Sequence, residues 1–522
     1  MKTKNILASV AVLAILTGCG GGGSGTPPPA NIPPTANAGV DAATIINSPI
    51  TINGSGSDSD GTITSYKWTE GSNALGTTAS LAYTPSTLGL HTLTLTVTDN
   101  DGATASDTVI INAINPTRVQ KLLLVRINFN DYTFNSNAST WASKIFGTFI
   151  GELNHYYNEL SKGNFQFAPA TESDGASDGI VTTTITSNHP GNDDPANNDF
   201  HFWNTFTTAL NQIDSKVDFS TFDTNNDGAI SRDELQIIFL VAGGETSTGW
   251  PAGSSVWGMK SCYEAPTTPS APTLDGVVLM QCSTQGDFAR FGERHFFNNP
   301  ADATIGIIAH ELGHSTFGLI DLYDTDGDSG GIGDFGLMSS GSWGAKAGQR
   351  PGETPVHMSA WSKVKAGFIT PTVLTNNTSI TKTLDGNNLA TYNVYRVDSS
   401  NAGEYFLVEN RPAAGYDLGL KNLAGLGSNQ FSGGLAVWHI DETQSDNTNQ
   451  NRKLVDLIEA NNPELDNSTG HNTGHINNLF FAGNLDTLTS SQTQTYNNTA
   501  TGFEITNIST PSTSMSADIK AQ

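Results

Sequence analysis

Two histidines four positions apart, with a glutamate directly after the first, stand in the segment "AHELGHSTFG". On a helix, His310 and His314 project from the same face one turn apart, so both imidazoles can bind one Zn²⁺ at about 2.0–2.1 Å. Glu311 points to the side, where its carboxylate can reach a water at the metal without binding the metal itself. Apolar residues on one face and a terminal Gly318 predict a helix over this segment.

A zinc site of this kind needs a third protein ligand, and no third histidine stands at the usual distance. A turn at Gly318 would bring Asp321, seven residues after His314, back to the metal. Catalytic zinc sites accept an Asp oxygen and leave a fourth position open to water. Downstream, Met338 in "FGLMSSGSW" stands where a tight turn can form an apolar floor under the metal, as in the metzincin arrangement.

Such a site would perform hydrolysis. Zinc lowers the pKa of its water toward neutrality and polarises a peptide carbonyl, and Glu311 would be the general base that takes the proton and passes it to the leaving amine. A further donor to the oxyanion is expected, and the candidates are His357, Tyr323 and His295. The motif defines the water chemistry but not the bond that is cleaved, so hydrolysis of a non-peptide bond stays open.

A second metal-binding pattern is the loop "DTNNDGAISRDE", which has the spacing of a calcium-binding EF-hand loop, with Gly228 at the sharp turn. The run "LQIIFLVAGG" that follows is typical of a buried strand, where an EF-hand would begin a helix. We therefore expect a calcium loop that braces a sheet. The candidate calcium ligands, at loop positions one, three, five, seven, nine and twelve, are Asp223, Asn225, Asp227, the backbone carbonyl of Ala229, Ser231 and Glu234.

The composition excludes some classes of partner. The chain has 522 residues, with 50 Asp and Glu against 24 Lys and Arg and a formal net charge of -26. Because this field repels phosphates, we expect neither nucleic acid nor an anionic membrane face as a partner. The charge suits a soluble exported protein that holds divalent cations, and the length predicts about three folded units.

The N-terminal segment "MKTKNILASVAVLAILTGC" predicts export, because two lysines precede an apolar run too short to span a bilayer. Its end, "LTGC", resembles the lipobox of bacterial lipoproteins, so residues 1–19 would be a lipoprotein signal peptide and Cys19 the lipidated residue; an ordinary signal peptide is the alternative. Residues 20–33 form a Gly/Pro linker. We expect lipid anchoring at the bacterial cell surface or outer membrane, or release. Cys262 and Cys282, an even pair in an oxidising compartment, predict a structural disulfide.

Three folded domains follow the linker. Residues 34–115 contain short alternating runs typical of a β-sandwich, and "SGSDSDGTITSYKW" with "LTLTVTDNDGATAS" resembles PKD domains, with Trp68 in the core. Residues 117–372 mix the buried strand "VQKLLLVRINF" with the helical spacing of "ASKIFGTFIGELNHYYNEL" and predict an α/β to α+β catalytic domain. Residues 373–522 are strand-rich and predict a C-terminal β-sandwich on or near the catalytic domain.

Several separated motifs carry a wider resemblance. The series "HELGH", "GLIDLYD" and "FGLMSSGSWG", with "HYYNELSKGNFQF" upstream and "GEYFLVENR" and "GGLAVWHIDE" downstream, resembles the immune inhibitor A family of secreted bacterial zinc metalloproteases. The resemblance implies a metzincin-like zincin that hydrolyses proteins or peptides. It also implies that His310, His314 and Asp321 are the zinc ligands and Glu311 the general base.

The sequence departs from the family pattern in two respects. Three residues, "STF", separate His314 from Gly318 where two are usual, and Ile320 stands where proline is common. Because the extra residue shifts the turn, Asp324 is the alternative to Asp321 as third ligand. Three further aspartates either bind Ca²⁺ or face solvent: Asp326, Asp328 and Asp334.

The competing interpretation is a non-catalytic, calcium-braced binding or adhesion lipoprotein at the cell surface, in which the helix motif is degenerate. Such a protein would be indifferent to loss of Glu311 and to zinc chelators, whereas a protease would not.

Overall fold

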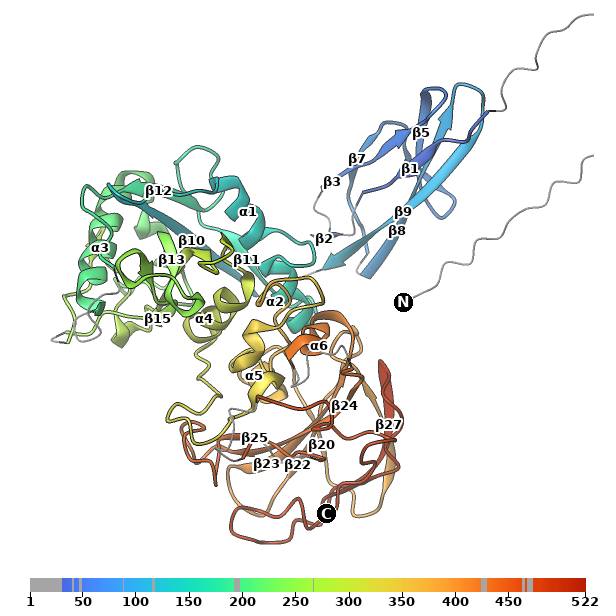
Figure 1. The fold of residues 1–522 in the computed structure, drawn as a ribbon, viewed down its shortest axis with the longest axis vertical. Coiled ribbons are helices and arrows are strands. Elements are labelled where there is room, and N and C mark those ends of the chain that lie inside the picture. Colours follow the sequence, from blue (N-terminus) through green and yellow to red (C-terminus); the bar gives the residue numbers. More distant parts are fainter. Residues whose placement is uncertain are drawn as a thin grey trace, which may run out of the picture. The chain divides into compact units, whose positions relative to one another are not determined.

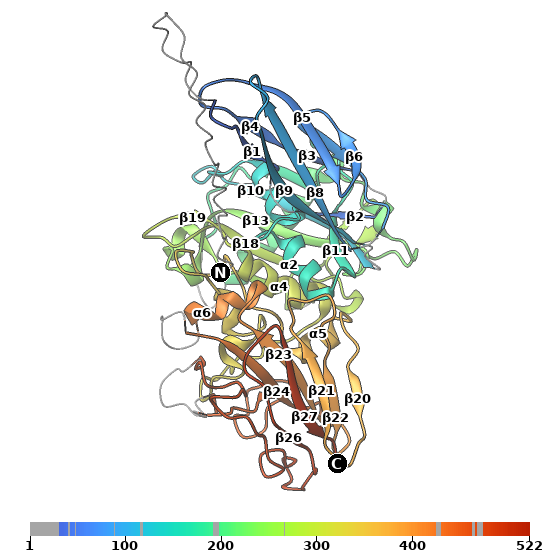
Figure 2. The same ribbon diagram turned by 90° about the vertical axis from the view of Figure 1, so that its right-hand side faces the viewer.

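The computed structural model describes residues 31–39, 42–46, 49–87, 89–114, 118–191, 198–265, 267–423, 430–461, 465–466 and 473–522 (Figure 1; Figure 2). The predicted signal peptide, its lipidation site Cys19 and most of the predicted linker lie outside these ranges. No helix in the described part of the chain is long and apolar enough to cross a membrane. The described residues form two compact units, of which the first holds residues 31–39, Thr51–Tyr83 and Thr92–Val109 and the second holds the other described residues.

Short strands with alternating burial form the N-terminal sheets. Every second residue of β8 from 91 to 99 is buried. Trp68 of β5 is fully buried opposite Leu95 of β8, and its Nε1 donates a hydrogen bond to the carbonyl of Thr78 at 3.1 Å, so it is a core residue. Strands β2-β9-β8-β5-β6 form one sheet, and β1-β4 and β3-β7 form two smaller ones. The strands are β1 (Thr35–Asn37), β2 (Ala42–Ile45), β3 (Ile50–Asn53), β4 (Ser55–Ser57), β5 (Ile63–Glu70), β6 (Asn73–Gly76), β7 (Ser80–Tyr83), β8 (Gly89–Asp99) and β9 (Thr104–Ile114).

A mostly parallel sheet, in the order β11-β10-β13-β18-β15, is the centre of the second unit. Its middle strands are nearly continuous apolar runs because both faces are covered: alternate residues of β10 and β13 pack with α1, α2 and α4 on one face and with α3 on the other. Strand β15 pairs antiparallel with β18 and lies at the edge. The elements are β10 (Arg118–Asn128), α1 (Ala138–Phe146), α2 (Leu153–Ser161), β11 (Phe165–Pro169), β12 (Ile180–Thr184), α3 (Asn198–Ile213), β13 (Gln236–Glu245), β14 (Ser255–Val256), β15 (Met259–Ser261), β16 (Thr273–Leu274), β17 (Val277–Val278), β18 (Phe288–His295), β19 (Ala301–Asp302) and α4 (Ile305–Phe317).

The segment "ASKIFGTFIGELNHYYNEL" is helical at both ends, as its spacing indicates, but it is interrupted in the middle. Helix α1 ends before Gly147, which is extended, and α2 begins at Leu153. Gly151, between the helices, has φ +96°, a conformation that favours glycine and stops the helix. The two helices can therefore lie at different angles on the sheet.

The strands after residue 370 form two sheets, in the orders β20-β22-β23-β24-β25 and β21-β27-β26. Residues of both sheets, including Phe406, Val437 and Met515, share one hydrophobic cluster. The opposite face of β23 and β24, with Leu407 and Trp438, belongs to the cluster that contains α4. The elements are α5 (Ala360–Lys365), β20 (Thr372–Leu374), β21 (Ile380–Asp385), β22 (Tyr395–Asp398), β23 (Glu404–Pro412), α6 (Leu420–Leu423), β24 (Gly433–Asp441), β25 (Val455–Leu457), β26 (Glu504–Thr506) and β27 (Ser514–Lys520).

A group of fully buried charges joins α5 to β23. Glu409 accepts hydrogen bonds from Lys363 Nζ at 3.1 Å, from Trp438 Nε1 at 3.0 Å and from the hydroxyl of Tyr392. Arg411 donates two hydrogen bonds to Asp417, at 2.6 and 2.7 Å, and lies 3.5 Å from Glu409. The two cations and two anions of this group, Lys363, Arg411, Glu409 and Asp417, balance one another.

Candidate active site

Helix α4 ends as its sequence predicts. Gly318 has φ +64°, and its N–H donates to the carbonyl of His314 at 2.9 Å, while the N–H of Leu319 donates to Gly313 at 3.1 Å. These two bonds close the helix and turn the chain back along it, which is the usual role of a left-handed glycine at a helix end.

The turn brings together three atoms that could bind one metal ion. His310 Nε2 lies 3.2 Å from His314 Nε2, and Asp321 Oδ1 lies 3.0 and 3.1 Å from these two nitrogens. Four ligands at 2.0–2.1 Å around a tetrahedral zinc are roughly 3.3–3.4 Å apart, so the spacing of the three atoms suits zinc.

The second nitrogen of each imidazole is also engaged. His310 Nδ1 lies 2.8 Å from the carbonyl of Leu337, and His314 Nδ1 lies 2.7 Å from that of Leu319. A carbonyl only accepts, so each Nδ1 carries the proton and each Nε2 keeps its lone pair for a metal. Two imidazoles, each neutral once a metal displaces any proton on Nε2, and one carboxylate form a donor set that fits a zinc ion.

Charge around these ligands shifts their titration. Burial lowers the pKa of His310, but its hydrogen bond with Asp321 and the charge of Glu311 raise it to about 9. Burial raises the pKa of Asp321, but its bonds to the two histidines hold it well below its usual range. Burial is the largest influence on the pKa of Glu311 and raises it above the ordinary value.

Asp321, and not Asp324, approaches the two histidines. Asp324 gathers with Asp326 and Asp328 in a separate acidic group, within which the ligand oxygens lie within 4.8 Å of one another. The residue inserted before Gly318 extends the helix to Phe317 and leaves the turn able to present Asp321. Asp334, the remaining aspartate of this region, is 1% exposed, and burial raises its pKa to about 7.

Glu311 lies in the same cavity as His310, His314 and Asp321, the three candidate metal ligands. The cavity has a volume of about 360 Å³ and is completed by Tyr323 and residues 257–260. The backbone N–H of Lys260 in β15 donates to Glu311 Oε2 at 2.8 Å and so fixes the carboxylate. Sequence reasoning missed this strand, because Trp257, Gly258 and Met259 match no catalytic motif and the contact from Lys260 is a backbone one.

Beneath the histidines, Met338 packs against a glycine of α4. Met338 is fully buried, and a Cβ at Gly313 would lie 2.5 Å from its sulfur. Gly313 therefore allows the close approach of the methionine segment, whose neighbour Leu337 receives the His310 hydrogen bond.

Of the three candidate oxyanion donors, the described structure brings one to the cavity. Tyr323 lines it and is 39% exposed, and burial, followed by the charge of Asp321 and a hydrogen bond to it, raises the pKa of its hydroxyl. His357 is fully buried and lies 2.8 Å from Glu159, and His295 is fully buried beside Thr304, so neither prediction holds.

The loop from Asp223 to Glu234 closes on itself. Asp223 accepts hydrogen bonds from the N–H groups of Asp227 and Gly228 at 3.1 and 3.0 Å, and Glu234 reaches back to the N–H of Ser231 at 2.9 Å. As predicted, the loop leads into the buried strand β13 instead of a helix. Among the described residues, its carboxylates do not form a group with ligand atoms within 4.8 Å of one another.

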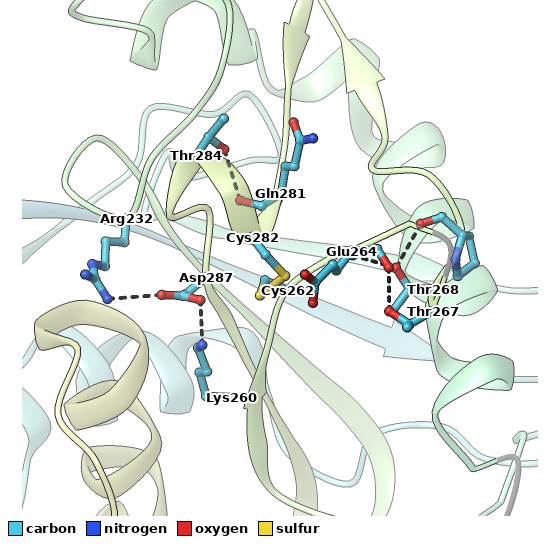
Figure 3. Close-up of a disulfide and its surroundings, with 11 residues drawn as sticks. Arg232, Lys260, Cys262, Glu264, Thr267, Thr268, Gln281, Cys282, Thr284 and Asp287 are labelled. Carbon is cyan, nitrogen blue, oxygen red and sulfur yellow. Dashed lines mark hydrogen bonds and ion pairs between the residues drawn. A yellow bond between two sulfur atoms is a disulfide. The ribbon is translucent and has the colours of Figure 1, made fainter. Parts of the chain in front are cut away.

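Cys262 and Cys282 form a disulfide across 20 residues, with their Cα atoms 5.0 Å apart. Figure 3 shows it beside an ion-pair series in which Asp287 lies between Arg232 and Lys260. The bridge therefore ties the end of β15 to the segment before β18. β15 is the strand whose Lys260 N–H donates to Glu311.

Helix α4 presents two histidines and a glutamate, and the turn after it adds an aspartate, an arrangement that suits a metal-dependent hydrolase. Residues 125–369 match the family described as "Immune inhibitor A peptidase M6, catalytic domain", and residues 38–113 match a family of PKD domains. The chain therefore carries a region that matches a peptidase M6 catalytic domain and one that matches a PKD domain, which confirms both resemblances.

One relative is the pre-pro-metalloprotease PrtV of Vibrio cholerae serotype O1 (strain M66-2), which is 29% identical to this chain over 191 residues. The match covers 33% of this chain and 19%, about a fifth, of that protein. Among solved structures, the PKD1 domain of Vibrio anguillarum Epp is 28% identical and covers 17% of this chain and 100% of that one, with a TM-score of 0.15. The PKD1 domain of Vibrio cholerae PrtV is 29% identical and covers 16% of this chain and 98% of that one, with a TM-score of 0.14.

Proposed function

We propose that the protein is a zinc-dependent endopeptidase that hydrolyses protein or peptide substrates. The observation that carries the proposal is the convergence of His310 Nε2, His314 Nε2 and Asp321 Oδ1 within 3.2 Å, beside the buried carboxylate of Glu311. A zinc ion held by these three atoms would supply Lewis acidity, making water more acidic and polarising the substrate carbonyl.

The protein's own groups would then transfer the proton and stabilise the negative charge that develops on the substrate oxygen. Glu311, fixed by the N–H of Lys260, takes the proton of the attacking water and delivers it to the leaving amine. Tyr323 is the donor best placed to stabilise the oxyanion. β15 is the edge strand of the described sheet, and an extended substrate would lie along it, beside the N–H that Lys260 donates to Glu311.

The remaining expectations belong to the same proposal. A metzincin-like arrangement is supported by α4, its left-handed turn and the methionine beneath it, and a C-terminal sandwich by the hydrophobic cluster between the last two sheets. We infer structural Ca²⁺ at the loop from Asp223 to Glu234, as its ligand spacing indicates. Export with a lipid anchor at Cys19 is supported by the N-terminal pattern and by the disulfide.

The test is casein or gelatin hydrolysis by the purified protein and by Glu311→Gln, with zinc measured in both by elemental analysis. We expect the variant to keep its zinc and to lose about 10²–10⁴-fold in rate, because general-base catalysis contributes about that much. Zinc chelation should abolish activity of the wild type, and added zinc should restore it. Full activity in Glu311→Gln would overturn the proposal, and a protein inactive in every form but able to bind surfaces would favour an adhesion function.

A further inference from the structure

A second cavity, of about 370 Å³, adjoins the one at Glu311 and shares Lys260, His314 and Asp321 with it. Arg232 and residues 318–320 complete its walls. A peptide whose carbonyl lies beside Glu311 would place a neighbouring side chain in this second cavity, because the two spaces have walls in common.

The second cavity is lined by two cations that share one anion. Asp287 lies 3.1 Å from Arg232 Nη1 and 2.8 Å from Lys260 Nζ (Figure 3). The carboxylate is the covered partner, since its side chain is 8% exposed against 24% for Arg232 and 34% for Lys260. Arg232 Nη2 also donates to Gln285 Oε1 at 3.1 Å. A guanidinium has five N–H donors and an ammonium three, so both cations keep donors for another acceptor.

Arg232, Lys260 and Asp287 together leave one excess positive charge at the second cavity, and nearby charges do not cancel it. Arg118, the next cation, pairs with Asp233 at 2.7 Å. Asp321, the acid that lines the second cavity, would be a zinc ligand under the proposed function, so its charge would be taken up by the metal. A positive cavity is unexpected from composition alone in a chain whose formal net charge is -26.

The two cations are held in place before any substrate binds. Lys260 pairs with Ala289 across β15 and β18, and the disulfide at Cys262 ties the end of β15 to the segment that leads to Asp287. Arg232 approaches through the space that Gly318 leaves, since a Cβ there would lie 2.9 Å from Arg232 Nη1. Preorganised donors of this kind bind an anion at low entropic cost.

We propose that the second cavity selects an acidic side chain, Asp or Glu, next to the scissile bond, with Arg232 and Lys260 as the specificity-determining residues. The inference rests on the proposed endopeptidase function and goes beyond it by naming the class of substrate. Asp287 holds the two cations in register, and the substrate carboxylate takes the donors that Asp287 leaves.

The test begins with cleavage of a randomised peptide library by the zinc-loaded protein, followed by a matched pair of peptides that carry Glu or Gln at the enriched position. We expect Asp and Glu to be enriched at one position on one side of the cleaved bond. The kcat/KM ratio of the Glu to the Gln peptide should be about tenfold, typical of a charge-assisted hydrogen bond. It should shrink as salt rises from about 0.1 M to 1 M, because screening weakens the attraction.

Substitutions distinguish the effect of the cations in the second cavity from the effect of the protein's overall charge. Arg232→Gln should bring the ratio toward one, and Arg232→Glu should move the preference to peptides with Lys or Arg. The matched control is Lys121→Gln, which removes one exposed cation that lies outside both cavities and should keep the wild-type ratio. Cleavage without acidic enrichment, or an unchanged ratio in Arg232→Gln, would overturn the inference and leave the endopeptidase standing. A protein that cleaves no peptide would overturn both.

Discussion

The buried charges between α5 and β23 allow a prediction about stability, because the balance of these charges decides whether a substitution lowers or restores the free energy of unfolding. Glu409→Leu removes one anion and leaves Lys363 and Arg411 facing Asp417 alone, so one buried positive charge is uncompensated. Removing one partner of a buried pair typically costs about 3–5 kcal/mol in the free energy of unfolding. Lys363→Met should cost less, about 1–3 kcal/mol, because Glu409 keeps several other donors.

The double variant distinguishes this reasoning from a simple loss of contacts. Adding Lys363→Met to Glu409→Leu restores charge balance, so the double variant should be more stable than Glu409→Leu alone. Urea unfolding followed by tryptophan fluorescence and circular dichroism would measure the series. Asp398→Asn, in the exposed pair with Arg396 at 2.6 Å, is the control and should change stability by less than about 1 kcal/mol. A double variant less stable than Glu409→Leu would refute the argument.

Three further predictions concern the second unit. Replacing Cys262 and Cys282 by serine should lower the free energy of unfolding by about 3 kcal/mol for a loop of this length, and urea midpoints equal to wild type would contradict it. Burial raises the pKa of Glu245 from 4.5 to about 7. Its stabilising contribution is therefore complete below pH 4.5 and is lost as pH rises through 7, which lowers the free energy of unfolding by roughly 3 kcal/mol. Glu245→Gln should flatten the fall in Tm between these pH values, and parallel Tm profiles of variant and wild type would count against this. Gly313→Ala should displace Met338 and weaken zinc retention about tenfold despite the better helix propensity of alanine, as metal content after dialysis would report; a variant that is more stable and fully loaded with zinc would exclude the close packing.

The local geometry of the candidate metal site was predictable because it depends on rules that act between neighbouring residues. The spacing of His310 and His314 and the left-handed glycine after the helix are properties of a few neighbouring residues. The choice of Asp321 over Asp324 was not settled by sequence, since it depends on the backbone path after Gly318. That path is set by hydrogen bonds to carbonyls of α4 that any residue type could make.

Other features depend on contacts that do not require a particular residue type and therefore could not be predicted from the sequence. The N–H of Lys260 holds Glu311, yet a backbone donor is the same in every residue but proline. His357 and His295 were plausible oxyanion donors by type, but tertiary packing buries both away from the cavity. The alternating strands of the PKD domain and the uniformly apolar β13 were predictable, because burial on one or both faces of a sheet imposes a pattern on the sequence itself.

The hydrophobic cluster shared by α4 and the C-terminal sheet has a practical consequence for anyone who cuts this gene into pieces. The match to the peptidase family ends at residue 369, which invites a fragment that stops there. Such a fragment would lose β23 and β24 and expose the apolar side chains of α5 and the methionine segment that these strands cover. An expressed fragment should therefore include all strands up to β27. The boundary at residue 369, drawn from sequence similarity, lies within one compact unit.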